Sequence, residues 1–251
     1  MTTVLAAIEA DACAQSVLST SLAIAELFEA SAVALHVRED ATASPRAVAA
    51  AAGIELRETT GDAIEQIIAA ARDADVAALA LGARGRHGGP QPAGHTALEV
   101  ITEVVKPVAV VPPQARAPDH LARILVPLEG SSESSHALEE TVQLAHRHEL
   151  EILVLHVHSP ATVPAFSDHE PHATAAWEQE FLTRYIATPH ERVSLVRRLG
   201  VPADDVVSVA NETTAELIVL AWGGNLSPGR ALVVSETLAR SHVPVLLIPT
   251  R

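Results

Sequence analysis

The sequence has few cysteine, lysine and aromatic residues, and each shortage argues against a class of chemistry. A single cysteine, Cys13, leaves no partner for an internal disulfide and agrees with a reducing cytoplasm. The single lysine, Lys106, precedes Pro107 and an apolar run, so no motif places a lysine for Walker-type phosphate transfer, Schiff-base formation or protein-kinase chemistry. Three Phe, two Trp and one Tyr leave little for stacking on nucleic-acid bases.

Basic residues are scarce as well. The 251 residues include 17 Lys and Arg against 31 Asp and Glu, a net charge of −14, which argues against a nucleic-acid backbone as partner. No run approaches the roughly 20 apolar residues of a membrane-spanning helix. The opening MTTVLAAIEAD has neither the basic segment nor the cleavage site of a secretory signal. We therefore expect a cytoplasmic protein that binds neither nucleic acid nor membrane.

What the sequence does contain is an internal repeat. Four strand-like blocks occur twice in the same order: residues 4–11 and 124–131, 33–37 and 153–157, 76–85 and 216–224, and 106–112 and 243–249. A Pro-rich polar stretch, residues 112–123, separates the two sets and is typical of a linker. The pattern predicts a tandem duplication, with an N-terminal domain at 1–117 and a C-terminal domain at 118–251.

Within each half, apolar strand-like runs alternate with helical patterns. Residues 12–30 have a spacing close to 3.6, and residues 134–149 are their counterpart. Runs such as VAALAL and LIVLA are apolar without alternation, which is typical of parallel strands covered by helices on both faces. The sequence therefore predicts an open α/β sheet in each half. The halves differ mainly in a longer insertion in the second, residues 159–189, which contains FSDHEPHATAAW.

The first half carries a glycine-rich loop after its fourth strand, where open α/β sheets bind ligands. Gly82, Gly85 and Gly94 allow close backbone approach, and the helix that begins near Gly94 presents free N–H groups. Arg84 and Arg86 add positive charge. A phosphate fits such a loop, although a flexible connection explains the same composition equally well.

The equivalent loop of the second half reads AWGGNLSPGRAL. Gly224, Gly229 and Arg230 superficially match a phosphate-binding GxxxxG[KR] pattern, but Ala231 stands where that pattern needs Ser or Thr. A loop that only helps the duplicate to pack is the favoured interpretation.

Together these blocks resemble the universal stress protein family over essentially the whole chain, as two tandem copies. The residues that carry the resemblance are Ile8-Glu9 and Leu128-Glu129-Gly130-Ser131, Leu-His-Val at 35–37 and 155–157, the glycine loop, and Pro-Val at 107–108 and 244–245. The resemblance implies two Rossmann-like (adenine nucleotide alpha hydrolase-like) domains, each an open five-stranded parallel sheet with helices on both faces. It further implies that the domains pair through their last strands about a pseudo-twofold axis, that the chain forms a homodimer, and that it has a regulatory or protective role in stress response.

Family members that bind ATP carry a G-x2-G-x9-G-[S/T] loop and an aspartate at the end of the first strand. By that resemblance, ATP or another adenine nucleotide binds in the N-terminal domain, with phosphates on the loop and adenosine near Glu9 and Val37. The implied residues are Glu9, Val37, Gly82, Arg84, Gly85, Gly94, His95 and Thr96. Glu9 replaces the aspartate, and Gly94 follows Gly85 after eight residues instead of nine. Counting from Gly85 favours Thr96 as the phosphate-contacting hydroxyl, whereas counting from the neighbouring glycine favours His95.

The second half departs further from this pattern. Ala221 replaces the first glycine and no Gly-Ser or Gly-Thr pair stands at the required place. The resemblance leaves a degenerate second site of Glu129, Gly224, Gly229 and Arg230.

Histidines offer one further candidate site. His156 and His158 end a strand, and Asp168, His169 and His172 follow in the insertion, a residue set that binds transition metals when it is brought together. His36 and His156 occupy matched repeat positions, which favours a shared structural role instead. We expect no metal.

Catalytic motifs are missing from the sequence. It has no G-x-S-x-G, H-E-x-x-H or Cys-x-x-Cys pattern, and the serines of 130–135 are explained by helix capping. Cys13, near a helix start, is better explained as a buried inert thiol than as an activated one. We therefore expect no catalytic residues and at most weak ATP hydrolysis.

The leading interpretation is a stress-response protein that senses an adenine nucleotide. One alternative is an interaction module of the same fold, which binds no nucleotide and acts through protein partners. A second alternative is a small-molecule hydrolase or transferase on a related fold, which requires a cluster of acid, base or nucleophile that the sequence does not show.

Overall fold

The computed structural model describes residues 2–38, 44–83, 93–116, 118, 120–158, 171–186, 192–226 and 231–250. Its strands are β1 (Thr3–Ala7), β2 (Ser31–Arg38), β3 (Glu55–Thr60), β4 (Val76–Gly82), β5 (Val108–Val111), β6 (Arg123–Pro127), β7 (Glu151–His158), β8 (Val193–Leu199), β9 (Leu217–Trp222) and β10 (Val245–Pro249). Its helices are α1 (Ala14–Leu27), α2 (Arg46–Ala51), α3 (Ala63–Ala71), α4 (His95–Glu103), α5 (Ser132–Arg147), α6 (Pro171–Tyr185), α7 (Pro202–Glu212) and α8 (Leu232–Arg240).

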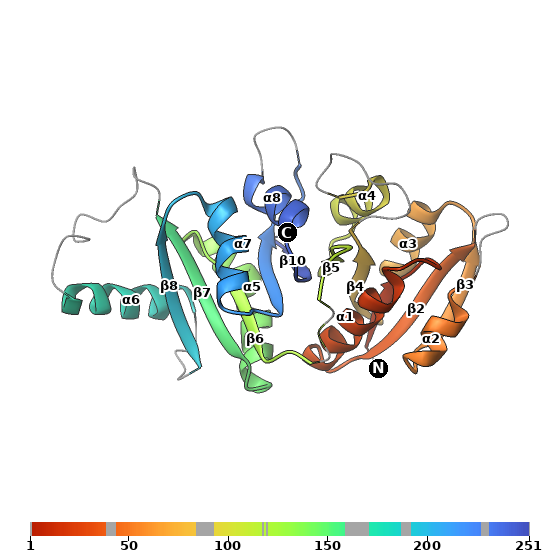
Figure 1. The fold of residues 1–251 in the computed structure, drawn as a ribbon, viewed down its shortest axis with the longest axis horizontal. Helices are drawn as coiled ribbons and strands as arrows, with labels where there is room; N and C mark the ends of the chain where they lie inside the picture. The colour runs from red at the N-terminus through yellow and green to blue at the C-terminus, as the bar shows by residue number, and fades with distance from the viewer. Residues whose placement is uncertain are drawn as a thin grey trace.

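The strands form one ten-stranded sheet in the order β3-β2-β1-β4-β5-β10-β9-β6-β7-β8, with the two halves side by side (Figure 1). Neighbouring strands within each half are parallel, whereas β5 and β10 pair antiparallel, with Val110 opposite Val245 and Val108 opposite Leu247. The predicted α/β fold, with an open five-stranded parallel sheet in each half, is confirmed. The last strands of the two halves meet at the centre, as the resemblance implies.

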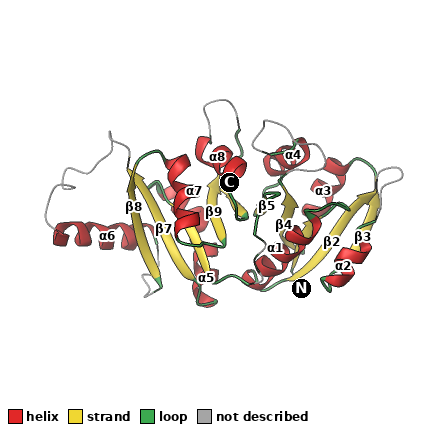
Figure 2. Cartoon of the chain, in the orientation of Figure 1, coloured by secondary structure: helices red, strands yellow, loops and turns green. Residues whose placement is uncertain are grey.

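Helices cover both faces of the sheet (Figure 2). One buried apolar cluster takes side chains from α1, α2, α5 and α6, and the other takes them from α3, α4, α7 and α8. Alternate residues of a strand enter opposite clusters, so Val4 and Ala6 of β1 lie in the first cluster and Leu5 in the second. This two-sided burial explains why the central strands are apolar without alternation. No helix in the described part of the chain is long and apolar enough to cross a membrane.

Contacts outside the sheet also join the halves. Gln114 donates from Nε2 to the Ser241 carbonyl at 3.0 Å, and the Arg116 amide donates to the His242 carbonyl at 3.0 Å. At the C-terminal end of α1, Glu29 pairs with Arg147 of α5, with 3.3 Å between Oε1 and Nη2. The stretch that the sequence marks as a linker is therefore held against the second half where it leaves β5.

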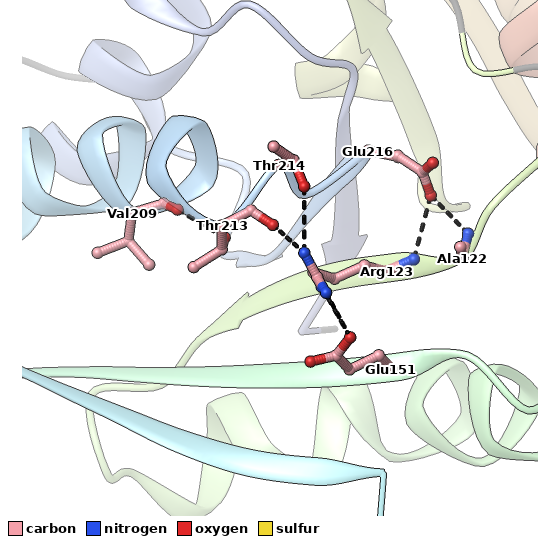
Figure 3. Close-up of polar contacts among 7 residues, drawn as sticks. All are labelled: Ala122, Arg123, Glu151, Val209, Thr213, Thr214 and Glu216. Carbon is pink, nitrogen blue, oxygen red and sulfur yellow. Dashed lines mark hydrogen bonds and ion pairs between the residues drawn. The ribbon is translucent and has the colours of Figure 1, made fainter.

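Arg123, the first residue of β6, connects β6 to the start of β7 and to the C-terminal end of α7 (Figure 3). Its Nε donates to Glu151 of β7 at 2.8 Å, and its Nη1 donates to the Thr213 carbonyl and the Thr214 hydroxyl after α7. The Glu216 carboxylate accepts hydrogen bonds from the amides of Ala122 and Arg123. One guanidinium thus connects two strands and the C-terminal end of a helix, where carbonyl groups lack helical partners.

The single lysine has a comparable role in the first half. Lys106 Nζ donates to the Asp73 carbonyl and, at 2.7 Å, to the Val76 carbonyl. Both acceptors lie between the end of α3 and the start of β4, so the ammonium group fixes the turn that leads into a central strand.

Candidate functional site

A cavity of about 390 Å³ opens at the carboxyl ends of β1, β2 and β4 in the first half. The chain continues from β1 to β2 on one side of β1, whereas β4 lies on its other side. This is the topological switch point at which open α/β sheets bind ligands. The N-terminal ends of α1, α3 and α4 complete the walls, and we call this cavity the N-terminal pocket.

The N-terminal pocket brings together most of the residues that the sequence singled out. Glu9, Val37, Gly82, Gly94, His95 and Thr96 all line it. Arg84 and Gly85 lie outside the described residues. Residues up to 87 positions apart therefore meet at one place, with Glu9 just after β1 and Val37 on the neighbouring strand β2. Nucleotide binding by these residues stays a prediction at this point.

The N-terminal end of α4 supplies the polar floor of the pocket. Gly94 is the N-cap of this nine-residue helix and makes no side-chain capping hydrogen bond. Its own amide donates to the Ala83 carbonyl at 2.6 Å, which fixes the place where the helix starts beside β4. Within the described residues, the amides of His95, Thr96 and Ala97 have no acceptor. They leave free donors at the positive end of the helix dipole, which favours an anion.

Two acidic residues, Glu9 and Asp11, follow β1 at the pocket and have different roles. Asp11 Oδ1 accepts hydrogen bonds from the amides of Cys13 and Ala14, at 2.9 and 3.1 Å, and so holds the turn that leads into α1. Glu9 is exposed and forms no ion pair among the described residues. Its carboxylate is therefore the one available to accept hydrogen bonds from a ligand.

His36, a further residue of the pocket wall, has a structural role. His36 is 2% exposed, and its Nδ1 donates to the Ile8 carbonyl at 3.0 Å. In the second half, Nδ1 of His156 makes the same contact with the Leu128 carbonyl at 2.8 Å. This equivalence confirms the shared structural role predicted from the repeat, which is to clamp the second strand of each half to the end of the first.

The thiol of Cys13 also lines the N-terminal pocket and is half-buried. Burial, and secondly the negative charge of Asp11, raise the pKa of this thiol above its ordinary value. A raised pKa keeps the thiol protonated at neutral pH, which agrees with the prediction of an inert cysteine.

The matching region of the second half has a different content. Glu129 Oε1 accepts hydrogen bonds from the hydroxyls of Ser131 and Ser134, at 2.9 and 3.0 Å. Ser131 also caps α5 by accepting from the Ser134 amide, so the predicted capping role of these serines is confirmed. Glu129 is thus engaged by its own chain, unlike Glu9. Gly224 follows β9 with a φ of +72°, and Gly229 and Arg230 lie outside the described residues.

Aromatic side chains of α6 lie against the end of β6. A Cβ on Gly130 would be 3.5 Å from the Phe181 ring and 3.8 Å from the Tyr185 ring. Phe181 also lies 4.7 Å from the His156 ring, and the two rings are tilted. Gly130 and His156 correspond in the repeat to Ala10 and His36, which line the N-terminal pocket. Aromatic rings of α6 therefore occupy the space beside Gly130, whereas the equivalent space beside Ala10 in the first half is part of the N-terminal pocket.

Sequence reasoning missed this helix and its aromatic residues. The apolar side chains of α6 do not concentrate on one face, so periodicity gives little signal. The only sequence clue is the spacing of Trp177, Phe181 and Tyr185 at four-residue intervals, which places them on one side of a helix.

Of the histidine candidate, the structure describes the side chains of His156 and His158. The rings of His156 and His158 lie 4.4 Å apart on one face of β7. Within the part of the chain that the structure describes, no group of three or more His, Cys, Asp or Glu side chains is arranged to hold a metal. Asp168, His169 and the side chain of His172 lie outside that part.

Comparisons with known proteins agree with this architecture. The family model described as the universal stress protein family matches residues 120–249. A universal stress protein from Archaeoglobus fulgidus DSM 4304 is structurally similar, with a TM-score of 0.69 and 18% identity over 99% of this chain and 98% of that one. A functionally unknown protein from Pseudomonas aeruginosa PAO1 gives a TM-score of 0.67 and 12% identity over 98% and 92% of the two chains. No curated protein sequence matches significantly. Since the family model covers more than half of the sequence, the chain belongs to the universal stress protein family.

Proposed function

We propose that this chain binds an adenine nucleotide in the N-terminal pocket and acts as a nucleotide-responsive regulatory or protective protein in the stress response. The observation that carries the proposal is the convergence of Glu9, Val37 and the start of α4 on one cavity at the switch point of the sheet. Its volume of about 390 Å³ lies within the range of roughly 300–1,000 Å³ that small-molecule sites occupy.

The chemistry of the lining fits such a ligand. The amides of His95 and Thr96, which have no acceptor among the described residues, would receive a phosphate group together with the Thr96 hydroxyl, because an anion is stabilised at a helix N-terminus. The Glu9 carboxylate would accept hydrogen bonds from ribose hydroxyls. The base would lie against Val37, at the end of β2.

The proposal assigns one nucleotide to each chain. Two described features of the second half support this assignment: Ser131 and Ser134 hold the Glu129 carboxylate, and the Phe181 ring lies beside Gly130, the counterpart of Ala10. The proposal is one of binding, with at most weak hydrolysis.

The test begins with the nucleotide content of freshly purified protein and continues with calorimetric titration of ATP. Wild type should bind with micromolar affinity at one site per chain. Glu9→Gln should weaken binding several-fold through loss of charge-assisted hydrogen bonds, and Ala63→Trp, which places a large ring in the pocket wall, should abolish it. Glu129→Gln is the matched control in the second half and should bind as wild type does.

Alkylation of Cys13 gives an independent readout, because it is the only cysteine of the chain and lines the pocket. ATP should slow the alkylation. Protein that is empty on purification, shows no heat of binding at millimolar ATP and gains no protection of Cys13 would contradict the proposal. That result would favour the alternative of an interaction module that acts through protein partners.

A further inference from the structure

A second cavity, of about 540 Å³, lies between α5 and the C-terminal end of α6. The described residues that line it all belong to the second half, and none of them lines the N-terminal pocket. The floor of this cavity is formed by four apolar side chains that are each more than nine-tenths buried: Leu128, Leu138, Val142 and Ile186. A ligand with an apolar body would pack against this floor and remove its own apolar surface from water, which is favourable in proportion to the apolar area buried.

Two charged side chains of opposite sign stand at the rim of this cavity, on different helices. Glu133 lies in the first turn of α5 and Arg184 in the last turn of α6. Among the described residues, Glu133 forms no ion pair, and Cζ of Arg184 lies 5.9 Å from the centroid of the Tyr185 ring. Glu139 differs, because it accepts a hydrogen bond from Gln143 at 3.3 Å and lies 3.4 Å from His136.

We propose that this cavity binds a small zwitterion with an apolar body, in chemical class an apolar amino acid or a short apolar peptide. Glu133 pairs with its ammonium group and Arg184 with its carboxylate, while the apolar side chain lies on the floor. Guanidinium is suited to this role because its planar donors match the two oxygens of a carboxylate. A ligand with only one charge leaves either Glu133 or Arg184 without a partner, which is the basis of selection.

The rim charges are exposed, so each contributes modestly to affinity. Exposed ion pairs contribute about 0.2–1 kcal/mol, which corresponds to a change in affinity of up to about fivefold. Most of the affinity therefore comes from the floor, and the two charges set the preference among ligands of equal size.

The experiment titrates the full-length protein with leucine and with the dipeptide Leu-Leu, using calorimetry or NMR line positions. N-acetylleucine lacks the ammonium charge and leucine amide lacks the carboxylate charge. At least one zwitterion should bind saturably at millimolar concentration or below, and both single-charge analogues should bind about three- to fivefold more weakly. Whether leucine or Leu-Leu binds more tightly distinguishes a free amino acid from a peptide as the ligand.

Variants assign each charge. In Glu133→Gln the preference for leucine over N-acetylleucine should disappear, and in Arg184→Gln the preference over leucine amide should disappear. Glu140→Gln and Arg192→Gln are matched controls, since both residues lie outside the cavity lining, and they should keep both preferences. Ser135→Trp, which places a ring in the cavity from a half-buried helical position, should abolish binding with the circular dichroism spectrum unchanged.

The inference fails if neither zwitterion saturates at millimolar concentration, if the analogues bind as well as the zwitterions, or if Ser135→Trp binds normally. The same variants should bind ATP as wild type does, because none of the substituted residues lines the N-terminal pocket. The outcome is therefore independent of the proposed nucleotide function.

Discussion

The indole of Trp222 donates a hydrogen bond from Nε1 to the main-chain carbonyl of Ile101, at 2.9 Å. The two residues belong to opposite halves of the chain and are 4% and 1% exposed. Ile101 lies in the last turn of α4, where carbonyl groups have no partner within the helix. The helix whose first turn lines the N-terminal pocket is thus connected at its last turn to the end of β9.

Trp222→Phe should lower the free energy of unfolding by about 1–3 kcal/mol. The substitution keeps an apolar ring but leaves the buried Ile101 carbonyl without its donor, and an unsatisfied buried acceptor costs about that much. Urea unfolding followed by circular dichroism measures the change. Stability equal to wild type would show that this hydrogen bond does not contribute to joining the halves.

Lys106→Met should destabilise the protein by about 1 kcal/mol, because the carbonyls of Asp73 and Val76 lose a charged donor while the apolar stem of the side chain is largely kept. Arg72→Met serves as the control, because it removes a nearby exposed positive charge that makes no side-chain hydrogen bond with the described residues. Thermal unfolding compares the two. Equal effects would mean that net charge, and not the contact with these carbonyls, is responsible.

Glu149→Gly should stabilise the protein by about 0.5–1 kcal/mol. Glu149 follows the C-cap of α5 with a φ of +57°, a conformation that glycine adopts without strain. Gly53→Ala is the converse test, since Gly53 follows the C-cap of α2 with a φ of +69° and a Cβ there would meet nothing within 4 Å. Its cost, about 1 kcal/mol, should therefore arise from the backbone alone. Chemical denaturation measures the change in the free energy of unfolding for both variants. A loss of stability in Glu149→Gly would contradict the role of the positive φ.

The alkylation rate of Cys13 should rise with pH through a midpoint above that of a free cysteine. Burial and the charge of Asp11 raise the pKa of the thiol, and only the thiolate reacts. Asp11→Asn keeps an oxygen acceptor for the amides of Cys13 and Ala14 but removes the charge, so it should move the midpoint down. Iodoacetamide rates across the pH range measure both, with Glu26→Gln as the control. A midpoint below that of free cysteine in the wild type would exclude this account.

The sequence alone predicts the repeated architecture because its central strands are unusually apolar. Blocks such as Val76–Gly82 are covered on both faces, so their composition carries a strong signal. The start of α4 at Gly94 also follows from the glycine pattern, and with it the position of the candidate site. The edge strands β3 and β8 escape prediction because they are partly exposed and contain charged residues such as Arg57 and Arg197.

Other features of the molecule depend on contacts between distant residues, which no local pattern encodes. The role of Lys106 requires carbonyls about 30 positions earlier, and that of Trp222 a carbonyl 121 positions earlier. The engagement of Glu129 by Ser131 and Ser134 is local, yet the sequence also permits a free carboxylate there. Only the side-chain positions distinguish Glu129 from its counterpart Glu9.

The antiparallel pairing of β5 with β10 joins two unequal halves within one chain. When two identical chains assemble symmetrically, every substitution appears twice, so a change that closes one ligand site closes both. Here the halves are encoded separately and always meet in a ratio of one to one. Phe181 and its neighbours on α6 are free to occupy the second half while the equivalent space beside Ala10 stays open. Covalent linkage thus allows the two copies to specialise without losing the interface that they share.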